Sequence, residues 1–170
     1  MTERFREGRE NQIRAIFASL FILQNRLQTA FDKGDKQITL KQFMLLILLK
    51  QAGKPEDMSR ADKALITLTR LGELLGCSRQ NVKKLASSLE QKGFVAIRQS
   101  PEDSRALWIE PTPRLWEYFG GVAEHHAKIL NLLFQDYSEE EIEALFRLLT
   151  KLYAGTQRIE AELMGGDKSK

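Results

Sequence analysis

The stretch TLTRLGELLGCSRQNV, residues 67–82, contains two helix starts separated by one tight turn. Thr67 and Ser78 are of the residue type that caps helix N-termini, and Gly76 is of the type that ends a helix. The sequence therefore predicts a short helix over 68–75 and a second helix that runs from its cap at Ser78 to Gln91. Two helices joined by so short a turn form a helix-turn-helix.

After this second helix, the spacing of the apolar residues changes from three or four positions, as in a helix, to every second position, as in a strand. Residues 94–98 and 105–110 are predicted to be strands joined by a polar loop, and Pro113 is predicted to begin the next helix behind the cap residue Thr112. The alternating apolar positions are Val95, Ile97, Leu107 and Ile109. A β-hairpin in this place is the wing of a winged helix-turn-helix.

Helices are predicted on both sides of this region. Between Ile13 and Ala30 the apolar residues recur at spacings of 3 and 4, with a second apolar face beside the first. A further helix begins after the cap residue Thr39 and ends near Gly53, with Phe43, Leu46, Ile47 and Leu49 expected to be buried. After the hairpin, one helix is predicted over 113–134, and another begins at the capping-box pair Ser138 and Glu141.

The last helix carries a regular heptad pattern, which favours a partner helix. Its apolar positions are Ile142, Leu145, Leu149, Leu152, Thr156, Ile159 and Leu163. Packing within the chain satisfies part of this pattern, and we expect the rest, together with the first helix, to form a homodimer interface.

The predicted fold class is mainly α with a small β-hairpin wing, within one domain of residues 1–170. A winged helix-turn-helix lobe is expected over 39–111, and residues 1–38 and 112–170 are expected to form a helical dimerisation lobe. Residues 54–66 are read as a polar connection that holds at most one helical turn.

Composition excludes several classes of protein. The 170 residues are 42% hydrophobic, which is not typical of a disordered chain, and the single cysteine cannot form an internal disulfide. The longest apolar stretches, 15–23 and 43–49, are too short to span a membrane, and the N-terminus does not resemble a secretory signal. We therefore expect a cytoplasmic protein with no membrane partner. There is no nucleophile–base set, phosphate loop or carboxylate pair, so neither an enzyme nor a cofactor is expected.

Charge is unevenly distributed along the chain. The net charge is +3, but residues 1–66 carry 12 basic and 8 acidic side chains, whereas residues 111–170 carry 7 and 10. Within the helix after Ser78, the face opposite the apolar stripe carries Gln80, Lys83, Lys84 and Ser87 and no carboxylate. Such a face is suited to approach phosphates and base edges, so double-stranded DNA is the expected partner.

Residues 67–82 resemble the helix-turn-helix of the MarR family of transcriptional regulators. The run LEQKGFV at 89–95 is similar to the exit from that family's recognition helix, and PEDSRA at 101–106 is similar to its Asp-x-Arg wing signature. The chain departs from the family at Gly72, where Ala is more usual. The resemblance implies a homodimeric winged-helix protein that binds a pseudo-palindromic operator. The helix over 78–91 is expected in the major groove of this operator, and the wing over 98–106 in its minor groove. A ligand-responsive repressor is the form it favours.

The resemblance and the chemistry of the side chains assign roles to individual residues. Amide, hydroxyl and lysine side chains read base edges in the major groove, and other basic side chains contact phosphates. The expected major-groove residues are Ser78, Gln80, Asn81 and Lys84. The expected phosphate contacts are Arg70, Arg79 and Lys83. The expected wing residues are Arg98, Asp103 and Arg105, with Arg105 entering the minor groove and Asp103 orienting it.

Three further readings stay open. A small aromatic or amphipathic ligand is expected to bind in a pocket lined by Phe17, Phe21, Phe43, Trp116 and Phe119, although aromatic residues at helical spacing are also usual in a core. A winged-helix module for protein–protein assembly, without an operator, is the alternative from another class. A regulator switched by a metal or by a thiol would use His125, His126 or Cys77, but the spacing does not resemble a metal site, and no metal is expected.

Overall fold

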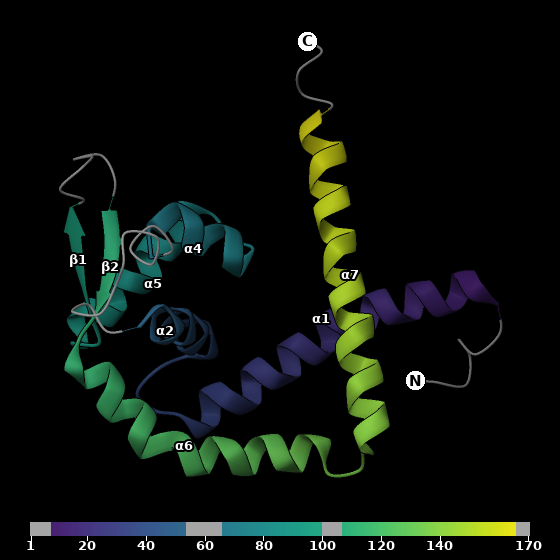
Figure 1. The fold of residues 1–170 in the computed structure, drawn as a ribbon, viewed down its shortest axis with the longest axis horizontal. Helices are drawn as coiled ribbons and strands as arrows, with labels where there is room; N and C mark the ends of the chain where they lie inside the picture. Colours follow the sequence, from purple (N-terminus) through teal and green to yellow (C-terminus); the bar gives the residue numbers. More distant parts are fainter. Residues whose placement is uncertain (1–7, 54–65, 100–106, 166–170) are drawn as a thin grey trace. The chain divides into compact units, whose positions relative to one another are not determined.

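The computed structural model describes residues 8–53, 66–99 and 107–165 (Figure 1). The elements are α1 Arg9–Gly34, α2 Leu40–Ala52, α4 Leu68–Leu75, α5 Arg79–Gln91, β1 Val95–Gln99, β2 Leu107–Pro111, α6 Pro113–Phe134 and α7 Glu139–Gly165. The chain divides into two compact units, one ending at Gly121 and the other beginning at Val122. The fold is mainly helical with a β-hairpin wing, as the sequence predicts. The predicted division into a DNA-binding lobe and a dimerisation lobe stays a prediction.

The helix-turn-helix forms by the predicted local rules. The Thr67 hydroxyl accepts a hydrogen bond from the backbone N–H of Arg70, and the Ser78 hydroxyl accepts one from the backbone N–H of Asn81, each 3.3 Å long. Gly76 ends α4 with φ 63° and ψ 36°, a left-handed conformation that glycine adopts without a steric cost. The turn therefore connects α4 to α5 with both helix ends capped.

Gly72 has a packing role that the sequence comparison with the family does not reveal. A Cβ atom at this position would lie 2.7 Å from the carbonyl oxygen of Cys77, because the backbone of the turn passes directly over α4. The backbone N–H of Cys77 also donates to the carbonyl of Gly72, at 2.9 Å. Glycine at this position therefore allows the two helices to approach closely.

We expect Gly72→Ala to lower the free energy of unfolding by about 1–2 kcal/mol, since overpacking against backbone outweighs the gain in helix propensity. Gly120→Ala is the matched control, because a Cβ there meets no atom within 4 Å and the substitution lies within α6. That control should stabilise the protein by a fraction of a kcal/mol, up to about 1. Denaturant titration measures both, and equal stabilisation by the two substitutions would contradict the packing role of Gly72.

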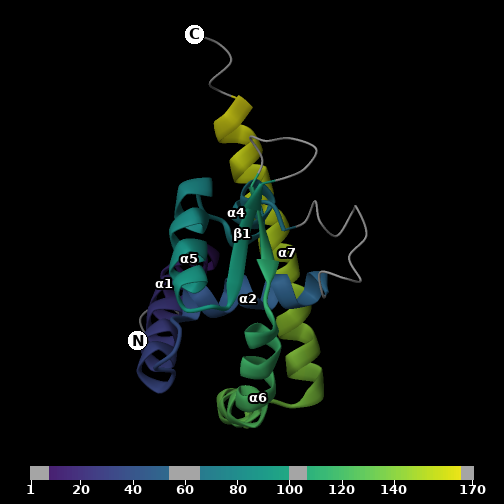
Figure 2. The ribbon, with the colours of Figure 1, turned by 90° about the vertical axis from the view of Figure 1, so that its left-hand side faces the viewer.

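A continuous apolar core lies between α2, α4, α5 and the hairpin (Figures 1 and 2). Its fully buried large side chains are Leu45, Leu46, Leu49, Ile66, Leu68, Leu71, Val82, Leu89, Phe94, Ile109 and Leu115. Leu45 was not among the expected core residues. Phe43, Ile47 and Leu85 are only half-buried.

The two strands pair antiparallel, with Ile97 opposite Ile109. The strand limits that can be compared differ from the prediction by one residue, because Phe94 is a buried residue that precedes β1, and Pro111 ends β2 by pairing with Val95. On the other side of β2, the backbone N–H of Ile109 donates a hydrogen bond to the carbonyl of Ile66, at 3.0 Å. This bond joins the start of the helix-turn-helix to the hairpin. The predicted polar loop and the 54–65 connection lie outside the described residues.

The corner between α1 and α2 is held by the carboxylate of Asp35. One oxygen accepts from the backbone N–H groups of Gln37 and Ile38, at 2.7 and 3.2 Å, and the other accepts from the hydroxyl of Tyr118 on α6. Burial raises the pKa of Tyr118 well above its ordinary value, and the hydrogen bond to Asp35 and the charge of that carboxylate raise it further. Folding therefore favours the protonated, neutral form of the Tyr118 side chain.

Because the folded pKa of Tyr118 lies above its unfolded value, its contribution to stability is complete below about pH 10 and is lost as the pH rises further. We expect Tyr118→Phe to remove the tyrosine ionisation step that occurs at the highest pH in the folded protein, as measured by tyrosinate absorbance. Tyr153→Phe, which alters an exposed side chain, should leave that step in place. A Tyr118→Phe titration identical to that of the wild type would contradict the assignment.

The long helices expose much apolar surface. None of the residues of α1 is buried in the single chain, so both of its predicted apolar faces are left accessible. In the second unit, the Ser138 and Glu141 capping box forms as predicted, and the heptad positions of α7 stay partly or fully exposed. Phe146 and Tyr153, four residues after Ile142 and Leu149, add further exposed apolar area.

In the part of the chain that the structure describes, no helix is both long enough and apolar enough to cross a membrane.

Candidate nucleic-acid interface

The exposed face of α5 is polar and basic. The residues Ser78, Arg79, Gln80, Asn81, Lys83 and Lys84 are all exposed. A shallow hollow on this helix is lined by Gln80, Lys83, Lys84, Ser87, Ser88 and Gln91. Neither Lys83 nor Lys84 forms an ion pair with a described residue. The structure thus places Gln80 and Lys84, two of the predicted base-reading residues, in one accessible hollow, together with Ser88 and Gln91, which the sequence analysis did not include.

The one carboxylate of α5 is held away from this surface. The Oε1 atom of Glu90 accepts a hydrogen bond from the backbone N–H of Ile97 in β1, at 2.7 Å (Figure 2 shows the helix beside the strand). Glu90 therefore attaches the wing to the recognition helix. It is not among the residues that line the hollow, so no carboxylate of α5 lies there to repel a phosphate.

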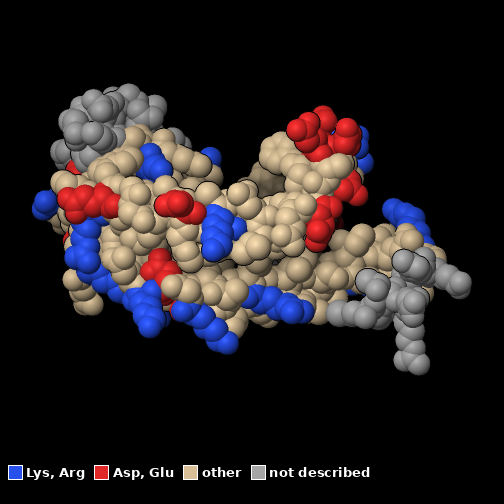
Figure 3. All heavy atoms as spheres, turned by 90° about the horizontal axis from the view of Figure 1, so that it is seen from below, with Lys and Arg blue, Asp and Glu red and all other residues tan. Residues whose placement is uncertain are grey.

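Lys92, the residue that follows α5, is also engaged within the fold. Its Nζ donates to the carbonyl of Gln37 at 2.8 Å and to Oε1 of Gln42 at 3.0 Å. The positive charges on the exposed face of α5 come from Arg79, Lys83 and Lys84. In space-filling representation, Lys and Arg side chains gather along one edge of the face that Figure 3 draws.

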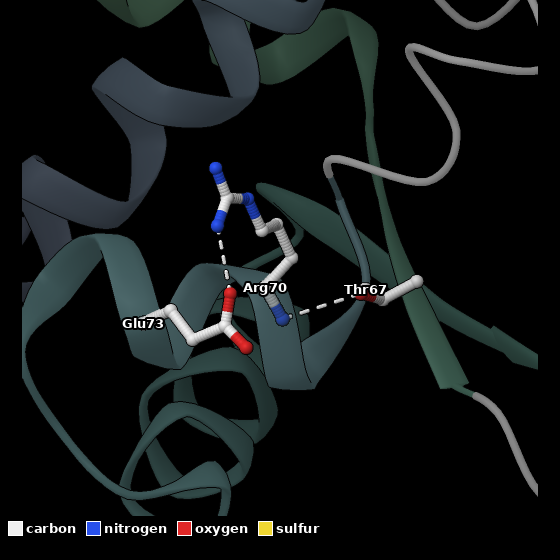
Figure 4. Close-up of polar contacts among 3 residues, drawn as sticks. All are labelled: Thr67, Arg70 and Glu73. Atoms are coloured by element: carbon white, nitrogen blue, oxygen red, sulfur yellow. Dashed lines mark hydrogen bonds and ion pairs between the residues drawn. The ribbon is translucent and has the colours of Figure 1, made fainter. Parts of the chain in front are cut away.

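Arg70, a predicted phosphate contact, lies on α4 with a partner of its own. Its Nη1 contacts Oε2 of Glu73 at 2.7 Å, and both side chains are largely exposed (Figure 4). An exposed pair one helical turn apart contributes at most about 1 kcal/mol, so a phosphate could displace Glu73. Unlike Lys83, Arg70 therefore carries a carboxylate partner within its own helix.

The wing residues are described only in part. Arg98 lies on β1, where its Nε is 3.6 Å from Oε2 of Glu110 on β2. Asp103 and Arg105 lie outside the described residues, so their predicted roles stay predictions.

The predicted ligand-pocket residues form two groups within the first unit. Phe43 and Phe119 lie together with ring centroids 5.7 Å apart, and Lys50 lies 4.6 Å over the ring of Phe119. Phe17 and Phe21 instead contact each other edge to face, with ring centroids 5.1 Å apart, and are 63% and 56% exposed. Trp116 is half-buried. The sequence reading missed Lys50, whose cation–π position beside the Phe119 ring depends on a contact between distant parts of the chain.

The residues of the metal and thiol alternatives are dispersed. The rings of His125 and His126 are 6.1 Å apart, and Cys77 is a half-buried free thiol. Among residues 8–53, 66–99 and 107–165, no three His, Cys, Asp or Glu side chains gather in a way that would hold a metal ion.

Known proteins that resemble this chain in sequence and fold are regulators of the MarR family. Residues 36–106 match the model of the MarR family. The transcriptional repressor MprA of Escherichia coli K12 is 28% identical over 141 residues, which cover 83% of this chain and 73% of MprA. Sco3205 of Streptomyces coelicolor, a MarR family regulator solved in complex with DNA, superimposes with a TM-score of 0.70 at 18% identity, covering 88% and 93% of the two chains. BpsR of Bordetella bronchiseptica, whose DNA binding is regulated by 6-hydroxynicotinic acid, superimposes with a TM-score of 0.64 at 18% identity, covering 88% and 95%.

The capped helix pair, the hairpin joined to both helices and the exposed basic face of α5 together define a winged helix-turn-helix protein. Residues 36–106 match the MarR family of transcriptional regulators, and the chain has the fold of solved members of that family.

Proposed function

We propose that this chain is a homodimeric, sequence-specific DNA-binding repressor that responds to a small ligand. Its 78–91 helix enters the major groove of a pseudo-palindromic operator, and the 98–106 wing enters the adjacent minor groove. Residues 39–111 form the DNA-binding lobe, and residues 1–38 and 112–170 form the dimerisation lobe. The observation that carries the proposal is the exposed face of α5, which holds Gln80, Lys83 and Lys84 while Glu90 is bonded to the hairpin.

The roles within the interface follow from side-chain chemistry. Gln80, Asn81 and Lys84, with Ser78, read base edges through their amide, ammonium and hydroxyl groups. Arg79, Lys83 and Arg70 contact phosphates and set the affinity and its salt dependence. In the wing, Arg105 contacts the minor groove with Asp103 as its partner, and Arg98 contacts the backbone nearby.

Dimerisation is supported by the exposed apolar residues of α1 and α7. Soluble monomers rarely leave so many large apolar side chains accessible on consecutive helical turns. A second copy of this chain would cover them and place two α5 helices about 34–36 Å apart, one turn of DNA.

Ligand response is supported by the aromatic group around Phe119. Phe43 and Phe119 present ring surfaces for a small aromatic ligand, and Lys50 beside them offers a positive charge to an acidic one. BpsR, a relative in fold, is regulated by a small aromatic acid. Such a ligand releases DNA only if it binds better to a dimer whose α5 helices are wrongly spaced for the operator.

The test is selection of bound sequences from random duplex DNA by the full-length protein. The proposal predicts a pseudo-palindromic consensus whose half-sites centre about 10 base pairs apart. Arg105→Ala should then weaken binding to the selected duplex, whereas Arg158→Ala on α7 should not. Recovery of no consensus would contradict the proposed function and would favour the protein-assembly alternative.

A further inference from the structure

A polar network built on one buried side chain connects the recognition helix to α2. Its centre is Gln42, which is 5% exposed. The Nε2 of Gln42 donates to the hydroxyl of Ser88 at 2.9 Å, and its Oε1 accepts from the Nζ of Lys92 at 3.0 Å and from the N–H of Thr39 at 3.1 Å. Lys92 donates further to the carbonyl of Gln37 at 2.8 Å, so the network also reaches the segment that precedes α2.

The apolar contacts of α5 alone do not define its orientation closely. Val82, Ala86 and Leu89 bury one stripe of the helix, but apolar contacts are not directional and tolerate small rotations and shifts. Hydrogen bonds to a buried amide are directional, and breaking one leaves a polar group without a partner in a low-dielectric site. A buried polar network can therefore select one orientation among several that bury the same apolar area.

The network contacts α5 at Ser88, about one turn after Lys84 of the nucleic-acid face. Ser88 lines the hollow together with Lys84, four residues earlier, and Gln91, three residues later. Base-edge recognition needs side chains held to within about 0.5 Å and 10–20°. A restraint on Ser88 and Lys92 therefore fixes the direction in which Lys84 points.

We propose that Gln42 and Lys92 are positioning residues that set the rotation and height of α5 for operator recognition, without contacting DNA. The inference rests on the proposed function and adds residues that the DNA-contact assignments do not include. Loss of the network leaves the fold and the phosphate-contacting charges of α5 in place, but it broadens the range of orientations that the helix samples.

The test compares Gln42→Met in the full-length chain with Tyr118→Phe. Methionine fills a similar volume without hydrogen bonds, and Tyr118→Phe removes a buried hydrogen bond that does not involve α5. At a temperature where all proteins are folded, Gln42→Met should weaken binding to the selected duplex about 2- to 30-fold, with little change on a scrambled duplex. The slope of log affinity against log salt should not change, because no phosphate contact is lost. Tyr118→Phe should bind like the wild type.

Lys92→Met and Lys41→Met remove the same charge, but the Lys41 side chain is exposed and lies outside the network. Only Lys92→Met should weaken binding to the selected duplex, and combining it with Gln42→Met should cost less than the product of the two single effects. Wild-type affinity for folded Gln42→Met, or equal losses for Lys92→Met and Lys41→Met, would overturn the proposal.

Amide hydrogen exchange separates this proposal from the proposed function. Without DNA, Gln42→Met should speed exchange over residues 85–92 and leave α4 unchanged. Unchanged exchange in that segment would overturn the positioning role even if the protein binds an operator. Faster exchange in a wild-type chain that selects no DNA would instead contradict only the DNA-binding function.

Discussion

Lys84→Ala is expected to weaken binding to the selected duplex by about 5- to 150-fold for each half-site, because the lost ammonium reads a base edge. Lys84 is exposed on the hollow of α5, and no described carboxylate is ion-paired with it. The loss should be largest on the selected duplex and should disappear when one base in each half-site is changed. Fluorescence anisotropy with a labelled duplex measures the affinities.

Lys83→Ala distinguishes a phosphate contact from a base contact on the same helix. It should weaken binding about equally on selected and scrambled duplexes and reduce the salt slope by about 2 for a dimer, one for each lost phosphate contact. Lys41→Ala, an exposed lysine on α2, is the control for a simple change in net charge. Identical behaviour of Lys83→Ala, Lys84→Ala and Lys41→Ala would show that α5 attracts DNA only through its charge.

Leu149→Glu is expected to convert the dimer to a monomer and to weaken operator binding by about 100-fold or more, because two linked half-site contacts become independent. Leu149 occupies the middle of the α7 heptad pattern and is 48% exposed in a single chain. In a dimer that covers this position, a buried glutamate without a partner is strongly unfavourable.

Thr150→Glu is the matched control for Leu149→Glu. It adds the same charge one residue away, on an exposed position that points about 100° from the heptad pattern. Analytical ultracentrifugation should find a dimer for the wild type and for Thr150→Glu, and a monomer for Leu149→Glu. A dimeric Leu149→Glu would contradict the assignment of this face to the dimer interface.

Features set by neighbouring residues were predictable from the sequence. Thr67, Gly76 and Ser78 each act within one helical turn, and the limits of α4, α5 and α6 agree with the prediction. The strand limits were less certain, because the end of β2 depends on Pro111 pairing with Val95 across the hairpin.

Features set by distant residues were not predictable. No local pattern indicates that the side chain of Lys92 bonds to the carbonyl of Gln37, 55 positions away. Gln42 has the capping-box spacing from Thr39, which was the one local signal for its position, although nothing local indicates its contact with Ser88. For the same reason, the apolar pattern of α1 does not indicate which of its faces packs within the chain.

Selection from random duplex DNA, carried out in parallel with the wild type and with Lys84→Ala, tests the central claim most directly. If the exposed face of α5 reads the sequence, both proteins should recover a pseudo-palindrome, and Lys84→Ala should lose its preference at one symmetry-related position in each half-site. An identical consensus from the two proteins would contradict base reading by this face of α5.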